Sequence, residues 1–235
     1  MSEKSRRALI LAQDILVVFF VAYAVIGMIT AKKDSVLVTR GLGAFKYYTV
    51  LSNILCAITS LVCVIYMLFN MTNGDKALPN GLYILHLTGC SVVSVTFIVV
   101  MIFLGPTFGY PLMFTGVSFW LHLVAPVLSI VAQILLKQQK PLRLRATLWA
   151  VVPTIIYGIV YVSVNAANWT GKSNRATDIY GFLTWGWGIG AVILISICVI
   201  NWLIALLYWK LGKPDAVKKA VKKTVKKTAE NREGE

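Results

Sequence analysis

Six long apolar runs, separated by short polar segments, organise the chain. They cover, approximately, 8–30, 47–69, 82–104, 114–136, 146–166 and 180–208. A helix rises about 1.5 Å per residue, so each run is long enough to cross the roughly 30 Å hydrocarbon core of a bilayer. The pattern predicts an all-α, polytopic membrane protein: a six-transmembrane-helix bundle over 1–208, followed by a basic tail over 209–235.

The composition supports this interpretation. Hydrophobic residues make up 58% of the chain and charged residues 14%, and the mean hydropathy is +0.75. Soluble domains carry about 25% charged residues, so this chain does not belong to that class. The first apolar run is longer than the roughly 7–15-residue core of a signal peptide, and we expect it to be retained as a span.

The distribution of basic residues predicts the orientation. The net charge is +14, and most of the 23 lysines and arginines lie in 1–7, 137–145 and the tail. With six crossings these segments share one side, and the excess of positive charge predicts that this side, with both termini, is cytoplasmic. The cell membrane is the expected location. Because the basic residues form no folded basic domain, we expect membrane lipids as partners and no nucleic acid.

The tail repeats the pattern AVKKAVKKTVKKTA, with valines at Val217, Val221 and Val225. A helix of this sequence would show one thin apolar stripe against dense lysine. Such a helix can bind anionic lipid headgroups, with about 1 kcal/mol from each lysine near the surface. A solvated, disordered tail that only enforces the topology explains the pattern equally well.

The four cysteines, Cys56, Cys63, Cys90 and Cys198, all lie inside apolar runs and form no C-x-x-C pair. This placement predicts small buried packing residues rather than metal ligands or disulfides. We expect no metal and no cofactor.

Three apolar runs carry a stripe of small or polar residues at helical spacing. Burying polar side chains against lipid is costly, so such stripes face the bundle interior or a water-filled cavity. They are Thr49, Ser52, Asn53, Cys56, Ser60 and Cys63 in the second run, Ser118, His122, Ala125, Ser129 and Gln133 in the fourth, and Thr154, Tyr157, Tyr161 and Asn165 in the fifth.

The ends of several runs predict a polar layer near the outer membrane surface. Thr49 and His122 lie near the outer ends of the second and fourth runs. Tyr161 and Asn165 close the fifth run, and Asp178 precedes the sixth. We therefore expect these five side chains at similar depth.

The chain has only two histidines, and their settings differ. Pro126 follows His122 by four residues. Because proline has no N–H, it cannot donate a hydrogen bond to the carbonyl of His122, which predicts a kinked helix and a free acceptor at the histidine. His86 lies near the cytoplasmic start of the third run, where we expect interfacial hydrogen bonds. Asp14 is the one acid expected within a span, near its cytoplasmic edge, so proton-coupled transport ranks below the other activities.

Three stretches carry a resemblance to a known family. FKYYTVLSNIL in the second run, FWLHLVAPVL in the fourth and DIYGFLTWG at the head of the sixth resemble a bacterial group of predicted six-transmembrane proteins. That group is distantly similar to the eukaryotic androgen-induced membrane proteins. These are intramembrane threonine hydrolases that act on fatty acid esters of hydroxy fatty acids. The resemblance implies Thr49 as nucleophile and His122 as the second essential residue.

The implied chemistry can be written with residues of this chain. A threonine hydroxyl becomes nucleophilic when an adjacent base takes its proton, and His122 would be that base. Asn53, one turn below Thr49, could donate to the developing oxyanion. Asp178 or Tyr161 could orient the imidazole, and Ser52, Ser118 and Asn165 would line the cavity.

Simpler interpretations stay open. A membrane threonine often bonds the carbonyl one turn back, and a membrane histidine can simply bridge two helices. The sequence therefore leaves two hypotheses: an intramembrane lipid-ester hydrolase, or a non-catalytic lipid-binding or carrier protein that uses the same polar cavity.

Overall fold

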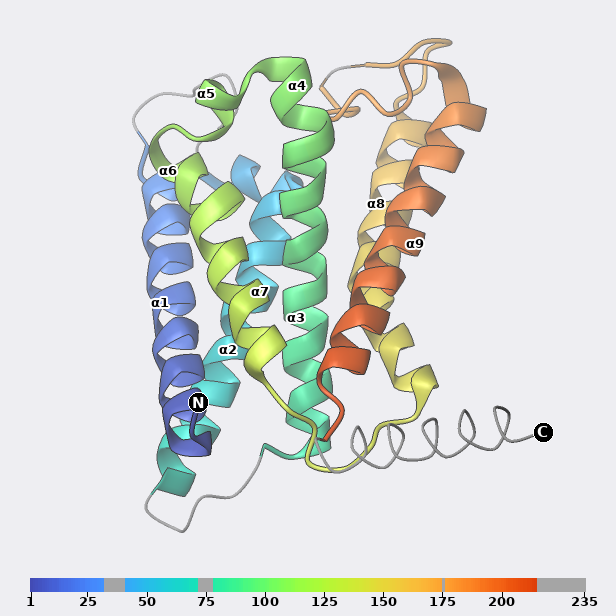
Figure 1. Cartoon of the computed structure of the whole chain (residues 1–235). Helices are drawn as coiled ribbons and strands as arrows, with labels where there is room; N and C mark the ends of the chain where they lie inside the picture. The colour runs from blue at the N-terminus through green and yellow to red at the C-terminus, as the bar shows by residue number, and fades with distance from the viewer. Residues whose placement is uncertain (32–40, 72–77, 175, 215–235) are drawn as a thin grey trace, which may run out of the picture.

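The computed structural model describes residues 1–31, 41–71, 78–174 and 176–214. Within these residues the chain forms helices and no strand. Six helical segments among them are long and apolar enough to span a membrane: Glu3–Ile29, Tyr48–Asn70, Asn80–Phe108, Gly116–Leu135, Leu144–Ala167 and Gly186–Leu211. The predicted six-helix membrane protein is thus confirmed. The first span begins at the end of the molecule where the last one finishes, which we call the terminal end (Figure 1).

Several spans consist of more than one element. The long helices are α1 (Glu3–Ile29), α2 (Tyr48–Met71), α3 (Asn80–Val99), α7 (Ala125–Leu135), α8 (Val152–Ala167) and α9 (Gly186–Leu211). Shorter elements are η1 (Gly41–Lys46), η2 (Val100–Leu104), α4 (Gly105–Phe108), α5 (Tyr110–Met113), α6 (Gly116–Phe119), η3 (Trp120–Val124) and η4 (Leu144–Val151).

The sixth span begins later than the apolar pattern predicts. It starts at Gly186, and Tyr180 lies in the turns that precede it. Gly181 and Gly186 adopt φ angles of 70° and 88°, which interrupt the helix and favour glycine. At its other end α9 continues to Leu211, beyond Tyr208, where the sixth apolar run was expected to end.

The cytoplasmic placement of the two termini stays a prediction. Residues 215–235, on which the predicted lysine-rich tail and its contact with anionic headgroups fall, lie outside the described residues.

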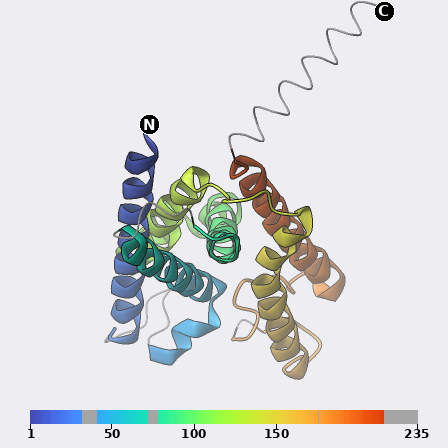
Figure 2. The same ribbon diagram turned by 90° about the horizontal axis from the view of Figure 1, so that it is seen from below.

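Four helices, α1, α2, α3 and α7, pack against one another and form what we call the four-helix body. The view along the helices shows this body on one side and the α8–α9 pair on the other (Figure 2). Apolar and small side chains from all four helices fill the core of the body, among them Ile10, Val17, Val21, Ala24, Cys56, Cys63, Leu87, Cys90, Val93, Ala125 and Ala132.

Gly89 allows α2 and α3 to approach closely. A Cβ added at this glycine would lie 2.1 Å from Thr59 Oγ1 and 3.0 Å from Cys56 Cα. The Thr59 hydroxyl bonds the Cys56 carbonyl on its own helix at 2.9 Å, which draws this polar group onto the α2 backbone. The absence of a side chain at Gly89 therefore sets the spacing of the two helices.

The α8–α9 pair is fastened to the body at the terminal end. Tyr83 of α3 donates a hydrogen bond to the carbonyl of Tyr208 over 3.0 Å, and the Tyr208 hydroxyl lies 2.7 Å from that of Ser94. In the connection after α7, the Gln138 amide donates to the carbonyl of Trp209 over 2.7 Å. Further from the terminal end, α9 diverges from α3 (Figure 1).

The fourth span contains a π-helical segment, η3, that ends two residues before Pro126. In a π turn the N–H of residue i+5 bonds the carbonyl of residue i, so the missing N–H of Pro126 deprives Leu121 of its donor. The side-chain amide of Asn53 donates to this carbonyl over 3.1 Å. The predicted irregularity at His122 is present, and in the π register the N–H that Pro126 lacks is the one that would reach the carbonyl of Leu121.

The third span repeats this arrangement. The π-helical segment η2 ends two residues before Pro106, which leaves the carbonyl of Met101 without a backbone donor. The Tyr110 hydroxyl donates to that carbonyl over 2.7 Å. In both spans a side-chain donor takes the place of the backbone N–H that proline lacks. A carbonyl within a membrane needs such a donor, because the lipid supplies none.

Candidate functional site

A cavity of about 870 Å³ lies between the four-helix body and the α8–α9 pair. Val95 and Val99 of α3 line one wall. Ile155 and Gly158 of α8, with Leu194 of α9, line the others. We call this space the large cavity. Its walls are mainly apolar, so they suit a hydrocarbon chain better than a polar solute.

Several residues that line the large cavity carry a hydroxyl group: Tyr48, Thr49, Thr96, Thr154, Tyr157, Ser163 and Tyr180. The Tyr180 hydroxyl accepts a hydrogen bond from the backbone N–H of Tyr48 over 2.7 Å and lies beside the Thr49 side chain. Since α2 begins at Tyr48, the hydroxyls of Thr49 and Tyr180 lie toward the end of the cavity that is away from the terminal end.

Tyr180 keeps its proton in this setting. Burial raises the pKa of its hydroxyl to about 12, although hydrogen bonds with Tyr157 and Tyr48 act in the opposite direction. At neutral pH this end of the cavity therefore presents the phenol of Tyr180 and not a phenolate.

Asp178 connects the segment before α9 to the end of α8. One of its oxygens accepts a hydrogen bond from the Tyr161 hydroxyl. The other accepts from the Ser173 hydroxyl at 2.6 Å and from the backbone N–H of Leu183 at 3.0 Å. The Asn165 amide donates to the carbonyl of Tyr161 over 2.9 Å. Tyr161, Asn165 and Asp178 therefore lie together, as the sequence predicts.

A smaller cavity of about 540 Å³ lies between α2, α8 and the segment before α9. Ser52, Tyr161 and Asn165 are among its lining residues, and Tyr48 and Tyr157 line both cavities. These two tyrosines also hold α8 against α2 and against η1, which precedes α2. The Tyr48 hydroxyl lies 2.7 Å from that of Thr154, and the Tyr157 hydroxyl donates to the carbonyl of Lys46 over 2.8 Å.

The three predicted residues at the start of α2 have different surroundings. Thr49 lines the large cavity. The Ser52 hydroxyl donates to the Thr49 carbonyl over 3.1 Å and lies 2.8 Å from the Thr96 hydroxyl. The Asn53 amide nitrogen donates to the carbonyls of Thr49 and Leu121 over 2.7 and 3.1 Å. Both hydrogens of this amide are thus engaged, and neither points to an oxyanion at Thr49.

His122 has a backbone partner of its own. Its Nδ1 lies 2.9 Å from the carbonyl of Met113, a contact that places the proton on Nδ1 and leaves the lone pair on Nε2. Neither Asp178 nor Tyr161 forms a hydrogen bond with the His122 ring. Instead, the Tyr161 hydroxyl donates to the Asp178 carboxylate. Ser118, one turn earlier, is buried.

The structure does not join the two residues of the predicted catalytic pair directly. In the part of the chain that the structure describes, no hydrogen bond connects Thr49 with His122, and His122 lines neither cavity. Asn53 is the link between their helices, through the carbonyl of Leu121. Their catalytic roles stay predictions.

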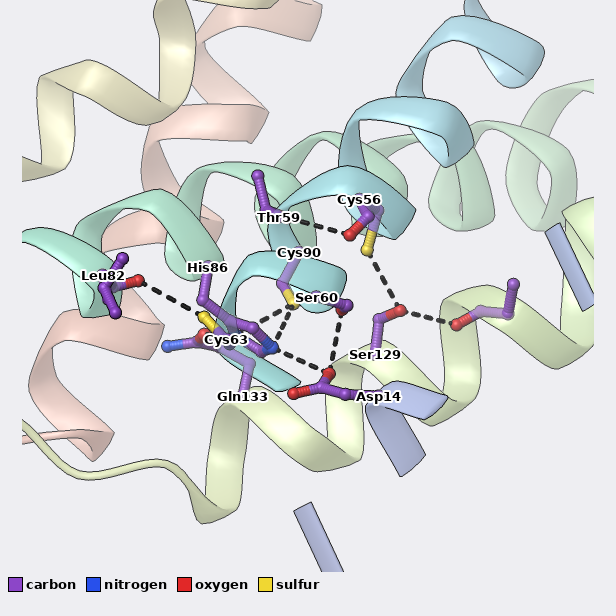
Figure 3. A network of polar contacts seen from close by, with 11 residues as sticks. Asp14, Cys56, Thr59, Ser60, Cys63, Leu82, His86, Cys90, Ser129 and Gln133 are labelled. Carbon is purple, nitrogen blue, oxygen red and sulfur yellow. Dashed lines mark hydrogen bonds and ion pairs between the residues drawn. The ribbon is translucent and has the colours of Figure 1, made fainter. Parts of the chain in front are cut away.

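The polar stripes of the second and fourth spans continue into the core of the body. There the structure places a pair that the sequence does not predict, Asp14 and His86, both completely buried. His86 makes hydrogen bonds, as expected, but with side chains of the core (Figure 3). The signal that could have revealed the pair is the position of Asp14 on the face of α1 that carries Ile10 and Val17.

The predicted burial of the cysteines is confirmed for three of them. Cys56, Cys63 and Cys90 are buried and unlinked, whereas Cys198 is partly exposed and lines the large cavity.

Comparisons of the chain with models of known protein families, with curated proteins and with solved structures found no match. The resemblance to the six-transmembrane group is therefore carried by the three sequence stretches alone. What the geometry establishes is a six-helix membrane protein with a mainly apolar cavity, several of whose lining residues carry a hydroxyl.

Proposed function

We propose that the protein binds a membrane lipid in the large cavity, as a lipid-binding or carrier protein. The acyl chain would lie along the apolar walls of α3, α8 and α9. The polar part of the lipid would lie at the hydroxyls of Thr49 and Tyr180. The observation that carries this proposal is the cavity itself, whose volume of about 870 Å³ falls within the usual range of ligand sites.

The position of the cavity supports lipid as the ligand. It lies between membrane-spanning helices, and its walls offer dispersion contacts to a hydrocarbon chain along their length. The hydroxyls can bond an ester or hydroxyl group, and no charged side chain lines this cavity. A neutral or ester-linked polar group therefore fits better than a strongly charged one.

Two glycines provide a matched test. Gly158 lines the large cavity, Gly188 does not, and a Cβ added at either one meets no atom within 4 Å. Gly158→Phe should fill the cavity with an aromatic ring, whereas Gly188→Phe should place the same ring on the exposed side of α9. We expect the lipid that copurifies with the wild type, measured by mass spectrometry after extraction, to be lost from the Gly158→Phe variant only. Equal lipid content in the two variants would refute the proposal.

A second candidate, the lipid-ester hydrolase, is favoured by the position of Thr49 on the cavity wall. In this route Thr49 Oγ bonds to the ester carbonyl carbon while its proton passes to Nε2 of His122. The ester C–O bond breaks, and the alcohol leaves with that proton. Water then cleaves the acyl-threonine ester and releases the fatty acid. The route requires the His122 ring to reach Thr49 when substrate is bound.

Labelling by a fluorophosphonate probe separates the two functions. A hydrolase should lose labelling in Thr49→Ala and in His122→Gln. It should keep labelling in Thr88→Ala, a control whose hydroxyl only bonds the Ile84 carbonyl on its own helix. Equal labelling of the wild type and Thr49→Ala excludes Thr49 as the nucleophile and leaves the lipid-binding proposal standing.

A further inference from the structure

A group of polar side chains from the four-helix body forms a connected network (Figure 3), and none of them lines either cavity. Each helix of the body contributes one member: Asp14 from α1, Ser60 from α2, His86 from α3 and Gln133 from α7. All four side chains are completely buried. An ionisable pair at such a position in a membrane protein is costly to bury and marks a site with a role of its own.

The contacts of His86 indicate how many protons the group holds. Its Nε2 lies 2.9 Å from an Asp14 oxygen, and its Nδ1 lies 2.6 Å from the side-chain oxygen of Gln133. A neutral imidazole has one N–H and one lone pair, and the lone pair cannot bond an oxygen that has no proton. Both contacts are hydrogen bonds to acceptor oxygens only if both ring nitrogens carry protons.

The Asp14 carboxylate depends on this proton. The Ser60 hydroxyl donates over 2.9 Å to the same Asp14 oxygen that faces His86. The second Asp14 oxygen has no hydrogen-bond partner among the described residues. If His86 lost the proton shared with Asp14, the carboxylate would keep one neutral donor in a fully buried position, and an uncompensated buried charge is strongly unfavourable.

We propose that Asp14 and His86 form a proton-binding site in the core of the four-helix body, where His86 is held as an imidazolium against the Asp14 carboxylate. The pair has no net charge. Adding or removing one proton would create a net charge in a region closed to water. The site therefore keeps its proton while the four helices stay packed and exchanges it when they separate, so that proton binding and closure of the body are linked.

The other titratable groups around the pair are thiols and two phenols, of which Tyr83 of α3 lies beside Gln133. Cys56 and Cys63 of α2 and Cys90 of α3 lie around it, with the Cys90 sulfur 3.5 Å from Nδ1 of His86. From α9, Tyr208 bonds Ser94 near Cys90. In α7 the nearby polar residues, Ser129 and Gln133, do not titrate. Among the described residues Asp14 is thus the acidic partner that can balance a charged His86.

Nitrogen NMR can count the protons directly, because the chain has only two histidines. With histidine labelled by nitrogen-15 and His122 replaced in His122→Gln, the only ring signals come from His86. We expect both ring nitrogens to be protonated at pH 7, as the contacts with Asp14 and Gln133 require. A neutral ring at pH 7 would overturn the proposal. It would mean that the proton lies on Asp14, or that the Gln133 amide is turned to present its NH₂ group.

Two variants test the role of Asp14. In Asp14→Asn the carboxylate is lost, and we expect His86 to become neutral with a proton on one nitrogen only. Glu3→Gln removes another acid from α1, one that is exposed and pairs with Arg7 over 2.7 Å, and should leave the ring doubly protonated. An imidazolium that persists in Asp14→Asn would refute the pairing. The ring in the His122→Gln protein decides the proposal even if Asp14→Asn does not fold.

Discussion

The Asn53 side chain donates a hydrogen bond to the Leu121 carbonyl, and a double-mutant cycle can test whether this bond replaces the one that Pro126 cannot make. Asn53→Leu keeps approximately the volume of the side chain and removes its amide. Pro126→Ala restores a backbone N–H at residue 126, and this N–H can donate to the Leu121 carbonyl. If the amide of Asn53 substitutes for the missing N–H, the effect of the first substitution should depend on the second.

The structure sets the size of the effect. Asn53 is completely buried, and in Asn53→Leu the Leu121 carbonyl would lose its donor, a cost of about 1–3 kcal/mol for a buried acceptor. The Asn53 side-chain oxygen has no partner among the described residues, so its removal offsets part of this cost. We expect a net loss of about 1–2 kcal/mol in the free energy of unfolding of the otherwise unchanged chain. In the Pro126→Ala background the loss should fall to about 0.5 kcal/mol or less.

The assay is equilibrium unfolding in mixed micelles of a mild detergent and sodium dodecyl sulfate, followed by tryptophan fluorescence. A parallel cycle with Tyr110→Phe and Pro106→Ala tests the same arrangement at η2, where the bond is exposed and the coupling should be smaller. If the Asn53 and Pro126 substitutions add within about 0.3–0.5 kcal/mol, the two residues are independent and the proposed compensation is wrong.

Two more predictions follow from close contacts and titration. Gly89→Ala should destabilise the protein by about 1–3 kcal/mol, since its new Cβ would lie 2.1 Å from Thr59 Oγ1, whereas Gly81→Ala, where a Cβ meets nothing within 4 Å, should be neutral or stabilising in the same unfolding assay. Tyr180 ionises near pH 10 when unfolded and near pH 12 when folded, so it contributes stability below pH 10 that is lost as the pH rises towards 12. Tyr180→Phe should reduce this alkaline loss, and an unchanged dependence of the unfolding midpoint on pH would contradict the burial of the phenol.

The six spans could be predicted from the sequence because a bilayer restricts a polypeptide more than water does. Every backbone polar group must be satisfied inside the segment, so a long apolar run has few alternatives to a helix. The apolar pattern misplaces the start of the sixth span at Tyr180. The Tyr180 side chain is compatible with a helix, but the turns at this point depend on the positive φ angles of Gly181 and Gly186. The apolar pattern contains no information on backbone φ at a glycine.

Contacts between spans were harder to predict than the spans themselves. Helical spacing places Tyr161 and Asn165 on one face of α8. The structure brings Tyr161 to the Asp178 carboxylate and Asn165 to the carbonyl of the neighbouring Thr177. The choice of partner, however, depends on which helices pack together. Asp14 was expected near a membrane surface, yet it lies in the core beside His86, because α1 and α3 both belong to the four-helix body.

The way the α8–α9 pair is attached separates the two proposed sites from each other. The described hydrogen bonds between α3 and α9 gather at Tyr208, near the terminal end, while Tyr48 and Tyr157 hold α8 to α2. The large cavity lies between these attachments, outside the packing among α1, α2, α3 and α7. His86 lies inside that packing. We therefore expect Gly158→Phe to lose its lipid and still show a doubly protonated His86 ring. A ring that became neutral when the cavity was filled would show that the cavity and the core of the body respond as one unit, contrary to the separate attachments that the structure shows.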